Sequence, residues 1–287
     1  MDPQLSLLSW PYRNISPVTE GRTQLKDAAR MPGSALIWRM AAAKYKRTSA
    51  RVEDRPGGLA LIAILPPAAD ITADGDLVHA LQRCRPHGVL PWHDSPAASD
   101  LTAVLRRPPL DLAADLTDYL VWRGLVVDQD TAHLIRRIVE LSAEIRSISA
   151  LARGMYMSRR ALGRRLLNQG LPVPSHWLQI SRIIRLGVRL QNSEASIFSL
   201  AYDAGYPDGF SVSNQMNRLM GHRPSQVREY LGWEWILEAW LRKEAHAGGL
   251  GRAGKAEITA GKRASAPPPR SFPAPRAGRR RKRDLVN

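Results

Sequence analysis

The sequence contains one cysteine, Cys84, among 287 residues. A single thiol can form neither an internal disulfide nor a cysteine-rich zinc site. The seven histidines are scattered without the spacing of metal ligands, so we expect no metal and no cofactor. Glycine-rich phosphate loops and the signatures of nucleophilic enzymes are also missing. These absences argue against an enzyme and are compatible with a reducing compartment.

Long hydrophobic runs are missing as well. No stretch approaches the roughly 18 apolar residues that indicate a membrane-spanning helix. The first residues, MDPQLSLLSWPYRN, have no basic region ahead of an apolar core, so they do not resemble a signal peptide. We therefore expect a cytoplasmic protein with no membrane partner.

Negative charge is scarce relative to positive charge. The chain has 42 Lys and Arg against 26 Asp and Glu, a formal net charge of +16. Such an excess favours a polyanion partner, either nucleic acid or an anionic membrane surface. Of these we expect double-stranded DNA, and hence association with the nucleoid, on the motifs described below. Residues 248–287 hold eleven basic and two acidic residues, which accounts for +9 of this charge. Because they are rich in Gly, Pro and Ala, they are predicted to form a disordered basic tail.

The N-terminal half divides into two predicted parts. Residues 1–55 are expected to be an irregular segment, and residues 57–128 a small α/β domain of unknown role. Strands predicted at 59–65 and 87–92 alternate with helices, which indicates parallel pairing. The strand–helix order resembles a degenerate receiver domain, because the first strand ends without the aspartate that would accept a phosphate.

Residues 131–232 are helical in pattern throughout. Breaks are predicted near 154–158, 170–175, 192–195 and 204–208. The fold class is therefore mainly α, with the small α/β segment in front of it and disordered tails.

The first break is followed by a clear helix start. Ser158 is a natural N-cap, because its hydroxyl can accept a hydrogen bond from a free backbone N–H of the next turn. Leu162 and Leu166 are four residues apart and should face inward together. Ser158 thus fixes which side chains of this helix point outward, and we count it among the positioning residues.

Four arginines lie on the outer side of that helix. Arg160 and Arg164 point away from the inner leucines and are predicted to read bases, because a guanidinium can donate two hydrogen bonds to guanine. Arg159 and Arg165 flank that face and are predicted to contact phosphates. This is the geometry of a recognition helix, with one side docked and the other side charged.

The pattern recurs at 199–216. Asp208 is the expected cap there, fifty positions after Ser158. A connector helix predicted at 175–191 carries an apolar side and joins the two copies. Two reading helices on one rigid connector could enter successive major grooves, about 34 Å apart.

The outer face of the second reading helix has little charge. Ser213 and Asn214 are predicted to read bases, since Asn can pair with adenine, and Asn217 and Arg218 are predicted to position the backbone. Phe210 could contact a thymine methyl group. The alternatives are that this helix docks on the DNA without reading bases, or that Phe210 packs in the protein core.

These features resemble the DNA-binding domain of AraC/XylS-type transcriptional regulators. The residues that match are Leu151, Ala152, Ser158, Leu162, Arg164, Arg182, Ile197, Leu200, Ala201, Gly205, Tyr206, Gly221, Pro224 and Arg228. The resemblance implies tandem helix-turn-helix units joined by a long helix, and sequence-specific DNA binding that regulates transcription. We assign Arg182, in the connector, to phosphate contact. Asn214 departs from the family, which usually has arginine there.

Residues 233–247 are predicted to form an amphipathic helix beyond that domain. Its apolar stripe either packs back onto the chain or contacts a second copy or RNA polymerase. The alternative function for the whole protein is nonspecific nucleic-acid or chromosome-associated binding, driven by the basic surface and tail. The effector is unknown.

Overall fold

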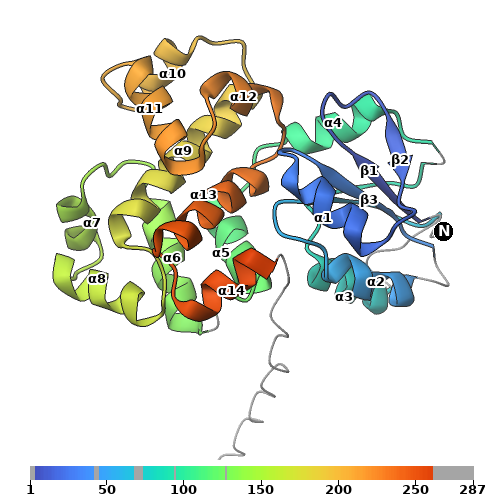
Figure 1. Cartoon of the computed structure of the whole chain (residues 1–287), viewed down its shortest axis with the longest axis horizontal. Helices are drawn as coiled ribbons and strands as arrows, with labels where there is room; N and C mark the ends of the chain where they lie inside the picture. The colour runs from blue at the N-terminus through green and yellow to red at the C-terminus, as the bar shows by residue number, and fades with distance from the viewer. Residues whose placement is uncertain (1–3, 42–44, 68–73, 94, 127, 261–287) are drawn as a thin grey trace, which may run out of the picture.

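The computed structural model describes residues 4–41, 45–67, 74–93, 95–126 and 128–260. It has a small mixed sheet with its helices at the N-terminal end and a larger bundle of helices after it (Figure 1). The fold is therefore mainly helical, as predicted. None of the helices among these residues is both long and apolar enough to span a bilayer.

Five strands form one sheet in the order β2-β1-β3-β4-β5. Strand β1 pairs antiparallel with β2 and β3, whereas β3, β4 and β5 pair in parallel. The predicted parallel pairing of the strands near 59–65 and 87–92 is thus confirmed. The strand bounds are β1 Leu5–Leu8, β2 Ile15–Pro17, β3 Ala35–Arg39, β4 Ala60–Ile64 and β5 Gly88–Leu90.

The prediction that residues 1–55 are irregular is wrong. Strands β1, β2 and β3 and helices α1 (Arg22–Arg30) and α2 (Tyr45–Glu53) lie there. Strand β4 is buried on both faces, so its backbone groups need a strand on each side, and β3 supplies one of them. Because a receiver domain has a parallel sheet, the antiparallel β1 also makes the receiver-like interpretation wrong.

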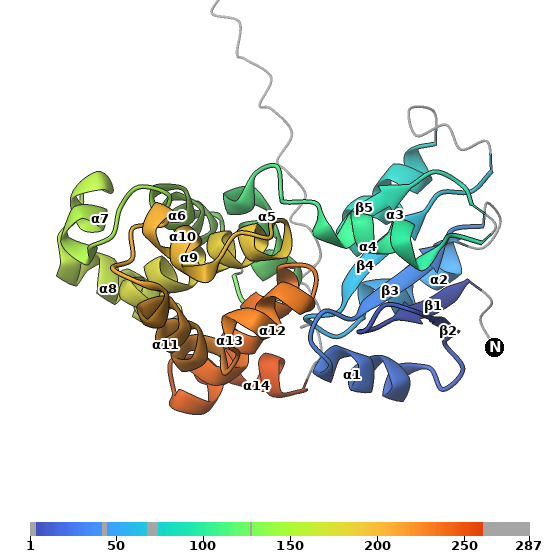
Figure 2. The same cartoon turned by 90° about the horizontal axis from the view of Figure 1, so that it is seen from above.

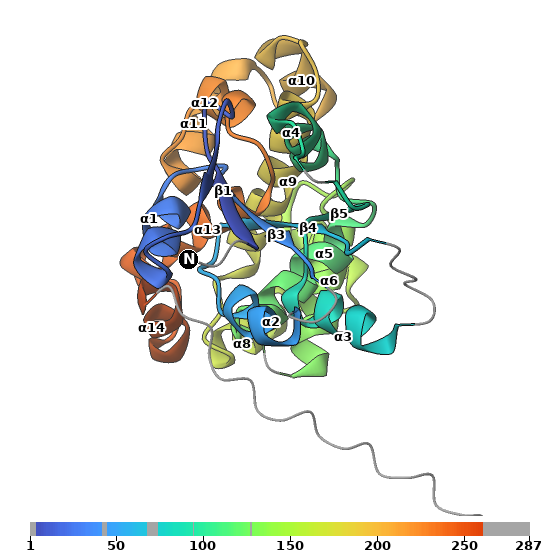
Figure 3. The same ribbon diagram turned by 90° about the vertical axis from the view of Figure 1, so that its right-hand side faces the viewer.

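Helices cover both faces of the sheet. Helices α1, α2 and α3 (Gly75–Cys84) pack on one face, and α4 (Ala98–Arg106) packs on the other. Alternation along β3 follows this division, because Leu36 and Trp38 face the first group and Ala35 and Ile37 face α4. Cys84, the last residue of α3, is buried in the core between these helices and the sheet. Figure 3 looks onto this sheet unit, with much of the bundle behind it.

The bundle begins earlier than the predicted boundary at residue 128. Helix α5 belongs to the bundle core rather than to the sheet unit. The helices from there are α5 Leu112–Trp122, α6 Gln129–Leu141, α7 Ile148–Gly154, α8 Arg159–Asn168, α9 Pro174–Gln191, α10 Ile197–Asp203, α11 Gly209–Met220, α12 Pro224–Glu229, α13 Glu234–Ala247 and α14 Arg252–Ala260. All four predicted breaks fall between helices. Helix α14 corrects the first part of the predicted disordered tail, and residues 261–287 lie outside the described residues.

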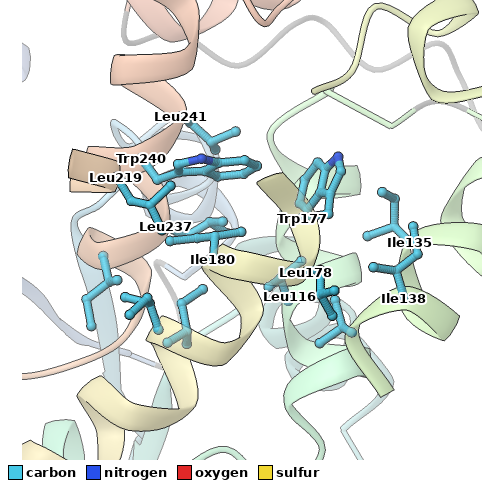
Figure 4. Close-up of a cluster of buried hydrophobic side chains, with 14 of the residues drawn as sticks. Leu116, Ile135, Ile138, Trp177, Leu178, Ile180, Leu219, Leu237, Trp240 and Leu241 are labelled. Atoms are coloured by element: carbon cyan, nitrogen blue, oxygen red, sulfur yellow. The ribbon is translucent and has the colours of Figure 1, made fainter. Parts of the chain in front are cut away.

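Helix α9, the predicted connector, runs through the middle of the bundle (Figure 2). It contacts α6, α7, α8, α10, α12 and α13. The ring centroids of Trp177 in α9 and Trp240 in α13 are 4.7 Å apart, and Figure 4 shows both rings within the buried cluster. The apolar stripe predicted at 233–247 therefore packs back onto the bundle, with Ile236, Leu237 and Leu241 fully buried.

Candidate nucleic-acid interface

Helix α8 has the predicted cap and the predicted inner face. The Ser158 hydroxyl accepts a hydrogen bond from the backbone N–H of Ala161 at 3.1 Å. Leu162 and Leu166 are both 0% exposed. Because the cap fixes the first turn and the leucines fix the rotation, the outer face of α8 is determined by local sequence.

The outer face of α8 carries the four arginines. All four side chains are exposed, as their spacing predicted. Arg165 lies 3.3 Å from Asp130 in an exposed ion pair. Arg159, Arg160 and Arg164 make no hydrogen bond or ion pair with any described residue, so their guanidinium donors face solvent. Their contact with DNA stays a prediction.

The turn between α7 and α8 contains a residue in an unfavourable conformation. Tyr156 has φ +55°, in the left-handed region, and its side chain is 98% exposed. Glycine occupies that conformation in the turn between α10 and α11, where Gly205 has φ +72°. An L-residue with a Cβ pays roughly 1–2 kcal/mol for this backbone geometry.

Replacing Tyr156 with glycine is expected to raise the free energy of unfolding by about 0.5–1 kcal/mol. The relief of backbone strain exceeds the extra conformational entropy that glycine gains in the unfolded chain. Urea denaturation measures the change. Tyr156→Ala is the matched control, because it removes the ring and keeps the strain. Equal stability of the two variants would show that Tyr156 is not strained.

Helix α11 also follows its predicted pattern. The Asp208 carboxylate accepts a hydrogen bond from the backbone N–H of Ser211 at 2.6 Å, and this bond lowers the pKa of Asp208. Val212 and Met216, the predicted inner pair, are 0% exposed. The start and the rotation of α11 are therefore fixed in the same way as those of α8.

The predicted polar residues of α11 lie on its accessible side. Asn214, Asn217 and Arg218 are exposed, and Ser213 is half-buried. Arg218 donates a hydrogen bond to Oε1 of Gln179 at 3.2 Å, which ties it to α9. This face therefore offers amide and hydroxyl groups, whereas the face of α8 offers charge.

Arg182 has a different environment from the one predicted. Its guanidinium donates a hydrogen bond to the carbonyl oxygen of Ala204 at 2.9 Å and lies 4.4 Å from the centroid of the Tyr206 ring. Both partners belong to the turn between α10 and α11. Arg182 thus fastens this turn to α9, and its contact with phosphate stays a prediction.

Phe210 does not pack in the protein core, so that interpretation is wrong. Its side chain is 70% exposed, and its ring stands edge-on to Phe198 with centroids 5.4 Å apart. Phe198, in α10, is 51% exposed and was missed by the sequence reasoning. Its signal was an apolar residue off the inner side of α10, where Leu200 and Ala201 are buried.

The described part of the chain contains no candidate metal site. No three side chains from His, Cys, Asp and Glu come together there in a way that could hold an ion. On α8, α10 and α11 the described surface offers hydrogen-bonding groups and the exposed rings of Phe198, Tyr202 and Phe210.

No protein-family model matches this sequence, and no curated protein matches it either. Among solved structures, the chain is similar to the transcriptional regulator CdpR from Pseudomonas aeruginosa, with 20% identity and a TM-score of 0.31. The match covers 66% of this chain and 60% of that one. A similarity this low supports no argument about fold or function, so both must be argued from the chain itself.

Proposed function

We propose that this protein is a sequence-specific DNA-binding transcriptional regulator of the AraC type. Helices α7–α8 and α10–α11 would be its two helix-turn-helix units, with α8 and α11 as reading helices. The observation that carries the proposal is α8, a capped helix with buried leucines on one side and solvent-facing arginines on the other. A helix of this form fits the major groove.

The central position of α9 supports binding by both units at once. This helix contacts α7 and α8 of the first unit and α10 of the second. Its buried side chains share one apolar core with both units, which would hold the two helices at a fixed spacing. The proposal needs no catalytic group, metal or cofactor.

The proposed roles follow the position of each side chain. Arg160 and Arg164 would read bases and Arg159 and Arg165 would hold phosphates, while on the second unit Ser213 and Asn214 would read bases and Asn217 and Arg218 would position the backbone. A second copy of the chain and RNA polymerase are further candidate partners.

Arg160→Ala is expected to cost about 1–3 kcal/mol of binding free energy and to relax preference at one base position. A bidentate contact to a base edge is lost with the guanidinium. Arg159→Ala is the matched control. Arg159 should contact only phosphate, so its replacement should weaken binding to all sequences alike. A DNA site is first selected from random duplexes by the full chain. The binding of each mutant protein to that site and to all its single-base variants is then measured. An even loss across these DNA variants for Arg160→Ala would contradict the assignment.

Nonspecific nucleic-acid binding is the second candidate function. It is favoured by the concentration of charge in 248–287 and by the weakly charged outer face of α11. A gel shift with selected and random duplexes separates the two. Specific binding requires a clear preference for the selected duplex, and removal of 261–287 should then flatten the salt dependence and increase that preference. Equal affinity for both duplexes would favour the nonspecific function.

A further inference from the structure

We propose that Phe198 and Phe210 form an apolar contact for thymine methyl groups in the major groove. The inference rests on the proposed function and deepens it, because it gives the second unit a base preference of its own. The two rings come from the two helices of that unit, α10 and α11. Together they make a site that neither helix would form alone.

The rings are held in place although they are exposed. Phe210 lies in the first turn of α11, two residues after the Asp208 cap, and Phe198 lies in the first turn of α10. The planes of the two rings are 85° apart, with their centroids separated by 5.4 Å. Edge-to-face pairs of this kind are favourable, so each ring orients the other.

Gly209 makes the close approach of α10 and α11 possible. A Cβ at this position would lie 3.2 Å from the ring of Phe198 and 3.2 Å from Cγ2 of Ile197. Gly209 is itself buried. The Phe198 ring therefore rests on the start of α11, within contact of the Phe210 ring.

The ring of Phe210 shares its face with the polar reading residues. Asn214 and Asn217 follow it at four and seven positions, which places all three along one side of the helix. The N-terminal part of a reading helix is the part that reaches base edges. Phe210 thus stands where a base contact is made rather than where a protein core would cover it.

Base chemistry favours an A·T pair at this position. Asn can form two hydrogen bonds with adenine, and the thymine opposite presents its methyl group in the same groove. An asparagine can therefore bind the adenine while the nearby aromatic ring contacts the thymine methyl group. The two bases can belong to one A·T pair or to two neighbouring pairs. The described outer face of α11 carries no unpartnered arginine that would select guanine. The second half-site should accordingly be rich in A·T, and the first rich in G·C.

Tyr202 provides a matched control for exposed aromatic surface. It lies one turn after Phe198 on α10 and is 81% exposed, yet it is not part of the ring pair. Tyr202→Ala removes a ring of similar size from the same helix. Phe210→Leu keeps an apolar side chain at the proposed contact.

The experiment begins with a site selected from random duplexes by the full chain. Each thymine of that site is then replaced by uracil, which removes only the methyl group. Burial of one methyl corresponds to about a fourfold change in affinity. We expect a threefold to fivefold loss, roughly that size, at one or two thymines of the second half-site. Phe198→Ala and Phe210→Ala should bind uracil and thymine equally there. Phe210→Leu and Tyr202→Ala should keep the discrimination.

The outcomes separate this inference from the proposed function. If no duplex is selected, both fail. If a site is selected that depends on Arg160, but uracil is tolerated at every thymine, the proposed function stands and the inference fails. If Phe210→Ala leaves DNA binding unchanged while the circular dichroism spectrum is intact, the rings serve a protein partner instead, and the inference is overturned.

Discussion

Replacing Glu238 with alanine is expected to lower the free energy of unfolding by about 3–5 kcal/mol. The carboxylate is 2% exposed and accepts hydrogen bonds from Nε of Arg123 at 2.6 Å and from the Tyr119 hydroxyl at 2.9 Å. Arg123 is itself 1% exposed. Removal of the carboxylate leaves a guanidinium buried without its ionic partner, which costs more than the pair contributes.

The pKa of Arg123 reflects the same two opposing effects, the cost of burial and the attraction of Glu238. Burial by itself lowers this pKa, but attraction to Glu238 and to Tyr119 outweighs burial, so the pKa of Arg123 is raised above its ordinary value. Without Glu238 the cost of burial dominates. The pair also explains the glycine beside it, because a Cβ at Gly57 would collide with both Glu238 and Arg123.

Urea denaturation of Glu238→Ala against Glu140→Ala measures this effect. Glu140 is a surface carboxylate, 3.2 Å from Nε of Arg136 and 3.1 Å from Arg137, and its loss should cost no more than about 1 kcal/mol. Similar losses for the two variants would mean that the buried pair is solvated or replaceable.

Stability is expected to fall as the pH rises above neutrality, because of a second buried pair. Nδ1 of His87, at the entry to β5, lies 2.9 Å from both carboxylate oxygens of Glu234, at the start of α13. Both side chains are less than 5% exposed. Arg85, with Nη1 at 4.0 Å from Glu234, and Asp115 also face this pair. The pair joins the sheet unit to the bundle.

The pKa shifts of the two partners set the direction. Burial by itself lowers the pKa of His87, but Glu234 outweighs burial and the pKa is raised. A raised histidine pKa stabilises the fold fully below about pH 6.5 and loses this effect as the pH rises through the folded value. Burial by itself raises the pKa of Glu234, but His87 and Arg85 lower it to about 2. That contribution is lost only as the pH falls from about 4.5 toward 2.

His87→Gln isolates the alkaline part of this dependence. Glutamine keeps a hydrogen-bond donor toward Glu234 but has no charge to lose. The free energy of unfolding should decline as the pH rises above about 6.5 in the wild type and much less in the variant. His222, whose pKa is lowered by burial, acts in the opposite direction and is the same in both proteins. Parallel curves would show that His87 is neutral in the folded protein.

Local signals allowed helices α8 and α11 to be predicted from the sequence. Ser158 and Asp208 are caps that act within one turn, and pairs of apolar residues four positions apart define an inner face without knowledge of any distant partner. The outward side chains of α8 and α11 follow from these few residues. That part of the candidate site therefore needed no tertiary information.

Features that depend on distant partners could not be predicted in this way. Strands β1 and β2 are four and three residues long, and only pairing with each other and with β3 makes them strands. Arg182 is the type of residue expected to contact phosphate, but the hydrogen bond that it makes is to the carbonyl oxygen of Ala204, in the turn after α10. The contact of the Phe198 ring with Phe210 depends on how α11 packs beside α10, which the sequence of α10 does not encode.

Residues 107–111 are the one covalent link between the sheet unit and the helices from α5 onward. Other contacts hold the same two parts together: the Tyr12 hydroxyl accepts a hydrogen bond from the backbone N–H of Leu231 at 2.8 Å, and Gly58 donates one to Tyr119 at 2.8 Å. A protease that cuts this exposed link should therefore nick the chain without separating its halves. The two fragments should elute together from a sizing column and part only in denaturant.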